Sequence, residues 1–225
     1  GKYKKISIAN NYTFLIDSNF AFSNFENWSA GHNKGFKKLL EISKNKKVVF
    51  DLGAHIGLCT LPLSRLASKV VSFEASPSNI KYLNKHLKIN NNLNVTVVPY
   101  LVGKENINRA DFYDVGNGSG IPSIVNLRIK KKKISIKNLK IEQIFLDDFV
   151  IKKSIIPDVI KIDVEGAEFN VLDGATKILT EYRPEIIISL HPEHLRILNR
   201  NVEEIFDYCN SYSYRLLSCL DEKIV

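Results

Sequence analysis

Short apolar runs alternate with amphipathic segments from residue 47 onward, and this alternation restricts the fold more than any other feature of the chain. The runs are rich in Val and Ile, which is typical of strands covered on both faces of a parallel sheet. Strands are expected at 47–51, 69–74, 94–101, 157–163 and 184–190, and helices at 57–66, 77–89 and 167–180. The sequence therefore predicts an α/β protein with a doubly wound, mostly parallel sheet and helices on both faces.

The third and fourth expected strands are separated by a long segment. Residues 104–150 carry a Gly-rich turn at 116–120, a lysine run at 128–133 and an alternating apolar segment from Ile134, where a single helix would suffice. Alternation beside a Gly-rich turn is typical of a β-hairpin. We therefore expect a hairpin inserted between these two strands.

Both ends of the chain are expected to add to this core. Residues 1–46 contain one expected strand at 12–16 and one expected helix at 35–43, and we interpret them as an N-terminal cap over the sheet edge. Residues 47–225 then form the main domain. The β-rich stretch at 214–220 predicts one further strand near the C-terminus.

Net charge and cysteine content narrow the partners and the compartment. With 32 Lys and Arg against 24 Asp and Glu, the chain carries +8 at pH 7. Its surface therefore favours anionic partners such as nucleic acid, phosphates and nucleotide-linked metabolites. The three cysteines show neither metal-ligand spacing nor a disulfide framework, so a reducing, cytoplasmic location is expected. No apolar stretch approaches the roughly 20 residues that cross a bilayer.

The first expected strand ends in a glycine-containing turn at 51–57 (Asp-Leu-Gly-Ala-His-Ile-Gly), where doubly wound folds bind adenosine-containing cofactors. The spacing differs from G-x-G-x-x-G, and an acid before the first glycine would repel a pyrophosphate. The same acid is favourable beside the cationic sulfonium and ammonium of S-adenosylmethionine. Glu74, at the end of the second strand, can accept hydrogen bonds from both ribose hydroxyls. The pattern favours S-adenosylmethionine over a nicotinamide dinucleotide, with helix capping by Asp51 and Glu74 as the alternative.

Acidic residues and a histidine are expected at the same edge of the sheet. Asp163 and Glu165 follow the fourth strand and His191 follows the fifth, so parallel strands bring them together. His191 can act as a general base while Asp163 or Glu165 orients it. The three can equally hold a divalent cation. A third interpretation is that His191 only caps the next helix, and the residues alone leave the three open.

Taken in order, these motifs resemble those of the FkbM-type S-adenosylmethionine-dependent methyltransferases. The matching segments are 50–57, 73–77, 146–148, 160–168, 172–175, 183–186 and 191–192. The resemblance implies the class I methyltransferase fold and S-adenosylmethionine as methyl donor. It also implies O-methylation of a small hydroxylated molecule, commonly a sugar or a polyketide.

The resemblance further implies which residues contact the cofactor. Those expected around its methionyl part lie in the first turn: Asp51, Gly53, Ala54, His55 and Gly57. Those expected around its ribose and adenine follow the second and third strands: Glu74, Ala75, Ser76, Tyr100 and Leu101. Asp163 is expected to contact the cofactor near the transferred methyl group, and the expected catalytic set is His191, Asp163 and Glu165.

We predict an O-methyltransferase whose acceptor is a phosphorylated or nucleotide-linked sugar for surface polysaccharide synthesis, the link to glycans resting on the resemblance only. A metal requirement stays open. The alternatives are an RNA ribose or other nucleic-acid methyltransferase and a non-catalytic cofactor-binding protein. Base methylation is disfavoured, because residues 163–166 (Asp-Val-Glu-Gly) stand where such enzymes commonly carry an Asn/Asp-Pro-Pro-aromatic turn.

Overall fold

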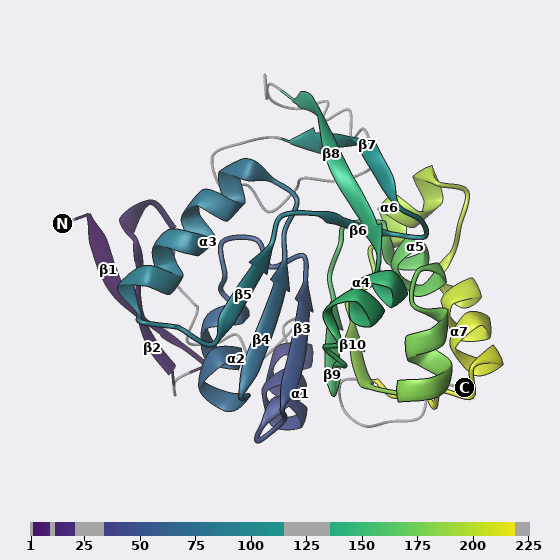
Figure 1. The fold of residues 1–225 in the computed structure, drawn as a ribbon, viewed down its shortest axis with the longest axis horizontal. Helices are drawn as coiled ribbons and strands as arrows, with labels where there is room; N and C mark the ends of the chain where they lie inside the picture. Colours follow the sequence, from purple (N-terminus) through teal and green to yellow (C-terminus); the bar gives the residue numbers. More distant parts are fainter. Residues whose placement is uncertain (1, 10–11, 21–33, 115–135, 219–225) are drawn as a thin grey trace.

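A five-stranded parallel sheet forms the centre of the protein in a computed structural model that describes residues 2–9, 12–20, 34–114 and 136–218. The strand order is β10-β9-β3-β4-β5, and every neighbouring pair is parallel (Figure 1). These strands are β3 (Val48–Leu52), β4 (Lys69–Phe73), β5 (Val95–Val98), β9 (Val159–Ile162) and β10 (Glu185–Ile188). The predicted α/β fold is confirmed.

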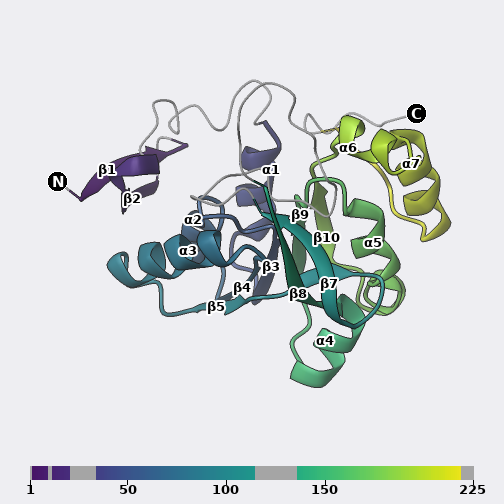
Figure 2. The same ribbon diagram turned by 90° about the horizontal axis from the view of Figure 1, so that it is seen from above.

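Helices cover both faces of this sheet (Figure 2). Alternate strand residues point to opposite faces, so Val49 and Val70 join one hydrophobic core while Phe50 and Phe73 join the other. The first face packs against α1 (Lys34–Ser43), α2 (Thr60–Leu66) and α3 (Pro77–Ile89). The second face packs against α4 (Leu146–Lys153), α5 (Glu168–Asp173) and α7 (Val202–Ser211). The predicted doubly wound arrangement is therefore confirmed.

The position of β3 in the middle of the sheet determines where a ligand can bind. The chain passes from β3 to β4 on one side and returns later to β9 on the other. At such a reversal the connecting segments diverge and leave a crevice at the carboxyl ends of the strands. The turns after β3, β4 and β9 all border this crevice.

A second sheet stands beyond the carboxyl ends of the central strands (Figure 1). Its strands are β6 (Leu101–Gly103), β7 (Ile107–Asp114) and β8 (Lys137–Phe145), in the order β6-β8-β7, with β7 antiparallel to β8. The segment predicted to hold a hairpin thus supplies an antiparallel strand pair. The connection at 115–135, which includes the Gly-rich turn and the lysine run, lies outside the described residues.

Two boundaries around this second sheet differ from the prediction. The third strand, expected at 94–101, ends at Val98, because Pro99 has no N–H to continue the ladder and Leu101 starts β6 instead. The expected insertion at 104–150 is also too long, since α4 begins at Leu146. This helix has only eight residues, too few for a clear periodic signal.

The N-terminal residues form two separate parts. β1 (Tyr3–Ile8) and β2 (Tyr12–Asp17) pair antiparallel beside α3, followed by a short 3-10 turn at Ser18–Phe20. The sequence predicted β2 but missed β1, whose consecutive lysines hide the strand pattern. The predicted helix is α1, whose buried residues Phe36, Leu39 and Leu40 pack toward α2 and the sheet. This helix therefore belongs to the layer on the first face.

The helix expected at 167–180 is interrupted after Asp173. Gly174 lies so close to the backbone of Gly103 that a Cβ would overlap the Gly103 carbonyl oxygen. The chain continues as a π-helical turn, Ile178–Tyr182, before β10. The expected helix is thus interrupted where the end of α5 packs closely against β6.

The further strand expected at 214–220 is wrong in its described part. After α6 (Pro192–Ile197) and α7, residues 214–218 are irregular apart from a single bridge at Leu217. The Arg183 guanidinium donates to the carbonyls of Tyr212 and Ser213, both at 3.0 Å, and lies over the Tyr214 ring. These contacts hold the chain in a turn.

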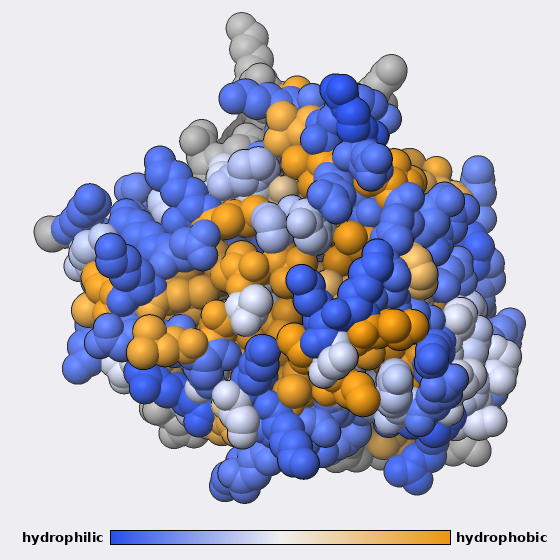
Figure 3. Space-filling model, in the orientation of Figure 1, coloured by the Kyte–Doolittle hydropathy of each residue, from blue (hydrophilic) through white to orange (hydrophobic). Residues whose placement is uncertain are grey.

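On the face shown in Figure 3, apolar side chains gather near β5 and α3. Leu93, two residues before β5, is 94% exposed. Apolar atoms make up much of any protein surface, so these side chains alone assign no function. In the part of the chain that the structure describes, no helix combines the length and apolarity needed to cross a membrane.

Candidate active site

The turn after β3 is pressed against the end of β9. Gly53 has a φ of 74°, which glycine adopts at little cost, and a Cβ there would overlap the Asp163 carbonyl oxygen. The amides of Gly53 and Ala54 both donate to the Phe73 carbonyl at 3.0 Å. The helix expected at 57–66 begins only at Thr60, so the preceding residues form a loop beside the pocket.

Asp51 lies beneath this turn, and its contacts stabilise the turn. It is fully buried, and its carboxylate accepts from the Lys161 ammonium at 2.9 Å and from the Thr60 hydroxyl at 2.6 Å. Lys161 also donates to the Gly53 carbonyl at 2.9 Å. Burial opposes the charge on Lys161, but Asp51 and Asp163 outweigh it and hold the pKa of Lys161 above its ordinary value. The pair therefore joins β3 to β9 under the site.

Glu74 presents a buried carboxylate at the end of β4. Its Oε2 accepts from the His55 amide at 2.7 Å, while Oε1 accepts from the Ser76 amide at 2.8 Å and the Asn79 side chain at 3.3 Å. Burial raises the pKa of Glu74, and these hydrogen bonds oppose the shift. A carboxylate has about four acceptor positions, so about one remains for a ligand rather than the two predicted.

Ser76 serves the start of α3 rather than the pocket. As the N-cap residue it accepts from the Asn79 amide at 3.3 Å. Its hydroxyl donates to Asp114 of β7 at 3.1 Å, which ties the second sheet to α3.

One pocket gathers most of the predicted cofactor residues. The predicted residues that line it are Gly53, His55, Glu74, Ala75, Tyr100, Leu101, Asp163 and Glu165. The predicted residues outside its lining are Asp51, Ala54, Gly57, Ser76 and His191. The lining residues that the sequence did not single out are Leu52, Phe73, Asn79, Val102, Phe112, Val164 and Ala167. Phe112 belongs to β7 of the second sheet. Its place in the pocket depends on how that sheet packs, so it could not be predicted from the cofactor motifs.

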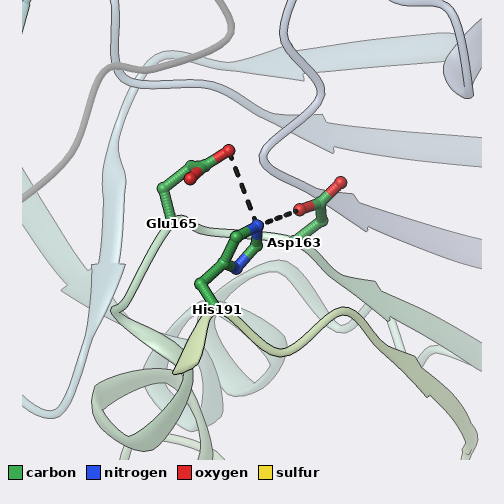
Figure 4. A group of neighbouring side chains, drawn as sticks. All are labelled: Asp163, Glu165 and His191. Carbon is green, nitrogen blue, oxygen red and sulfur yellow. Dashed lines mark ion pairs between the residues drawn. The ribbon is translucent and has the colours of Figure 1, made fainter. Parts of the chain in front are cut away.

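Asp163, Glu165 and His191 meet beside this pocket, as predicted from the strand ends (Figure 4). His191 Nε2 lies 3.5 Å from Asp163 Oδ1 and 3.6 Å from Glu165 Oε1. Glu165 has a left-handed φ of 52°, a conformation that costs energy for a residue with a side chain. All three side chains are half-buried, and two of them, Asp163 and Glu165, also line the pocket.

A second layer of groups orients His191. Its Nδ1 lies 2.7 Å from Oε1 of Glu168, which is fully buried and also accepts from the Gly166 amide. The ring stacks on His194, whose Nδ1 is 3.3 Å from Glu165. These contacts fix the direction in which Nε2 points.

The acidic surroundings shift two of these groups. Burial disfavours protonated His191, but Glu168, Glu165 and Asp163 outweigh it, so the pKa of His191 lies above its ordinary value. Burial raises the pKa of Glu165 as well, with Asp163 adding to the shift and His191 opposing it. Both side chains therefore hold a proton more readily than they would in water.

Comparisons with known proteins agree with this geometry. Methyltransferase FkbM from Methylobacillus flagellatus KT has a TM-score of 0.50 at 22% identity, over 75% of this chain and 37% of that chain. Precorrin-6y C5,15-methyltransferase from Geobacter metallireducens has a TM-score of 0.50 at 14% identity, over 89% of this chain and 80% of that one. These likenesses define the class: the fold is that of a class I methyltransferase.

The family follows from the sequence. The profile described as Methyltransferase FkbM domain matches residues 51–216, and the chain belongs to the FkbM methyltransferase family. S-adenosylmethionine is its cofactor, as predicted. The tRNA(Phe) (4-demethylwyosine(37)-C(7)) aminocarboxypropyltransferase of Methanocaldococcus jannaschii is 32% identical over 89 residues, which are 39% of this chain and 35% of that protein. The chain thus spans about a third of the length of this curated relative.

The chemistry of the pocket fits this cofactor. Glu74 offers a carboxylate for a ribose hydroxyl, and Leu101, Val102 and Phe112 offer an apolar wall for a flat base. Asp163 supplies a negative charge on the side of the pocket nearest His191. A carboxylate suits the positive sulfonium or ammonium group of the cofactor.

Proposed function

We propose that the protein is an O-methyltransferase acting on a hydroxyl of a small molecule, a sugar or nucleotide-linked sugar used in surface polysaccharide synthesis. The observation that carries the proposal is the set of Asp163, Glu165 and His191 beside the cofactor pocket. Two carboxylates and an imidazole in this position suit the removal of a proton from an alcohol.

The bound cofactor supplies a methyl group already activated on its sulfonium sulfur. The chain's own part is to place the acceptor oxygen behind the methyl carbon, exclude water and accept the hydroxyl proton. With the cofactor bound, the methyl group would pass from sulfur to the acceptor oxygen, and His191 or a neighbouring carboxylate would take the hydroxyl proton. The products are a methyl ether and S-adenosylhomocysteine. No covalent enzyme intermediate is required, and burial raises the pKa of Cys59 to about 12, which keeps this thiol unreactive.

We assign the predicted cofactor residues as follows. Glu74 binds the ribose, while Tyr100 and Leu101 contact the adenine together with Phe112, all of them in the pocket lining. Gly53, whose missing Cβ makes room for the Asp163 carbonyl, contacts the methionyl part from the turn after β3. Asp51 supports this turn through Lys161 rather than by direct contact.

The acceptor class rests on family membership and on the net charge of +8, which favours a phosphorylated or nucleotide-linked sugar. We place the reaction in the cytoplasm, in keeping with three cysteines that lack disulfide or metal spacing.

The test is a panel of nucleotide sugars incubated with the protein and S-adenosylmethionine carrying a labelled methyl group. We expect transfer to at least one sugar, and a loss of roughly 100-fold or more in His191→Gln. The matched control is Glu193→Gln, an exposed residue two positions away, which should retain the rate. Transfer to RNA or a lipid alone, with none to the panel, would contradict the proposal. Cofactor binding with no transfer to any acceptor would indicate a non-catalytic protein.

A nucleic-acid acceptor is the second candidate. It is favoured by the charge of +8 and by the stretch that is 32% identical to an archaeal enzyme named for tRNA(Phe). An RNA enzyme should bind RNA with an affinity that falls steeply with salt, with a logarithmic slope of about −0.7 per phosphate contact on single strands. An enzyme for nucleotide sugars should show no such binding.

A further inference from the structure

We propose that Asp163, Glu165 and His191 bind one divalent transition-metal ion of the Mn²⁺ class. The binding site rests on side-chain geometry and local charge, and only its use in methyl transfer rests on the proposed function. Each residue offers one ligand atom, and the three atoms lie within 4.8 Å of one another.

The distances suit ligands of a shared ion better than hydrogen bonds. His191 Nε2 is 3.5 Å from Asp163 and 3.6 Å from Glu165, beyond the roughly 2.7–3.2 Å of a hydrogen bond. Two atoms that each lie about 2.1 Å from one ion are separated by roughly 3.0–3.5 Å. A small movement of the Glu165 side chain would therefore complete the site.

The hydrogen bond between His191 and Glu168 also supports a metal site. Its Nδ1 lies 2.7 Å from the fully buried Glu168 carboxylate, which can only accept, so the proton sits on Nδ1. The other nitrogen, Nε2, is then directed at the two carboxylates (Figure 4). A carboxylate that holds the second nitrogen of a histidine is the usual support of a metal-bound imidazole.

The negative charge of the carboxylates around His191 also favours a bound cation. Asp163, Glu165 and Glu168 surround one imidazole, and Glu168 Oε2 is buried with no hydrogen-bond partner among the described residues. The Lys161 ammonium is 2.9 Å from Asp51 but 3.7 Å from Asp163, so it serves Asp51 first. A divalent ion would offset the remaining negative charge.

The mixed ligand set selects the kind of ion. Carboxylate oxygens alone would suit Mg²⁺ or Ca²⁺, whereas an imidazole shifts the preference toward Mn²⁺, Fe²⁺ or Zn²⁺. Three protein ligands leave coordination positions open. An acceptor hydroxyl bound there would lie beside the cofactor pocket and lose its proton more readily. With His191 Nε2 on the ion, the proton would pass to a carboxylate oxygen of Asp163 or Glu165 that does not bind the ion.

Titration of Mn²⁺ into the protein saturated with S-adenosylhomocysteine tests the site, with free Mn²⁺ followed by electron paramagnetic resonance. We expect one ion per chain in the wild type and in the matched control Glu193→Gln. Binding should be lost in His191→Ala and in Asp163→Asn, and weakened about 10- to 100-fold in Glu168→Gln. A cooperative thermal unfolding transition, followed by circular dichroism, identifies variants that are folded.

Absence of saturable Mn²⁺ binding in the wild type would overturn the site, as would equal affinity in the wild type and the two ligand variants. Methyl transfer to nucleotide sugars without Mn²⁺ binding would also overturn it, while leaving the proposed function intact. Mn²⁺ binding that follows the expected variant order, with no transfer to the sugar panel, would support the site and contradict the proposed function.

Discussion

The buried ion pair between Lys161 and Asp51 is the residue-scale feature on which the shape of the site depends. A lysine within a strand covered on both faces is costly unless it is paired. Here it is 5% exposed, and it bonds both Asp51 and the carbonyl of Gly53 in the cofactor turn. The same interaction thus compensates a buried charge and fixes the turn.

Lys161→Met should destabilise the protein by about 3–5 kcal/mol, because it leaves the Asp51 carboxylate buried without a counter-ion. Urea denaturation measures this loss. The double variant Asp51→Asn with Lys161→Met should lose less than Lys161→Met alone, since neither charge remains. An unchanged urea midpoint in Lys161→Met would refute the role assigned to the pair.

Glu74→Gln should weaken S-adenosylhomocysteine binding about 10- to 100-fold, because a hydrogen bond to a charged acceptor contributes roughly 1.5–3 kcal/mol. Isothermal titration calorimetry measures the affinity directly. Glu142→Gln, an exposed glutamate on β8, is the matched control and should bind normally. Equal affinities in the two variants would remove Glu74 from the ribose site.

At the scale of elements, α3 connects the N-terminal strand pair to the cofactor turn through His86. The His86 Nδ1 donates to the Ile56 carbonyl at 2.8 Å, and Nε2 accepts from the Asp17 amide at 2.9 Å. This pattern requires a neutral ring. Burial lowers the pKa of His86, with Lys85 adding to the shift and Asp17 opposing it.

Stability should therefore fall as the pH drops below about 6.5, because the unfolded chain takes up a proton on His86 that the folded protein resists. Above that pH the contribution is fully present. Asp17, whose pKa the Lys85 ammonium holds below its ordinary range, titrates at lower pH. Thermal midpoints across this range measure the effect, and His86→Gln should flatten the slope. The same slope in both proteins would show that other groups cause it.

The contact of α5 with β6 gives a second prediction at this scale. Gly174→Ala should cost about 1–3 kcal/mol, because the new Cβ would overlap the Gly103 carbonyl and force the two elements apart. Gly35→Ala in α1 is a matched control, since nothing lies within 4 Å of its added Cβ. It should be neutral or slightly stabilising. Chemical denaturation that ranks the two variants the other way would contradict the account.

At the scale of the whole molecule, both sheets contribute to the pocket. The central sheet holds the turns after β3, β4 and β9 at one edge, and the second sheet covers that edge from the outside. Phe112 of β7 reaches the pocket, and Asp114 of the same strand bonds Ser76 at the start of α3. The pocket is therefore closed by a part of the chain distant from the cofactor motifs.

The different roles of the two sheets explain which features could be predicted from the sequence. The central strands and the positions of Glu74, Asp163 and His191 follow from apolar runs and from residues at strand ends, which are local signals. The start of β6 at Leu101 and the pocket residue Phe112 depend on pairing between distant strands, which leaves no local signal. The end of β5 did have one, since Pro99 follows Val98. The partnership of Lys161 with Asp51 does have a sequence signal, namely a charged residue inside an otherwise apolar run.

The central claim is methyl transfer to the oxygen of a small acceptor, and carbon-13 NMR of the product tests it most directly. With S-adenosylmethionine carrying a ¹³C methyl group and nucleotide sugars as acceptors, we predict one new methoxy resonance. It should be absent with Asp163→Asn and His191→Gln and present with Glu193→Gln. A ¹³C label that appears only on RNA, or on carbon or nitrogen instead of oxygen, would contradict the account.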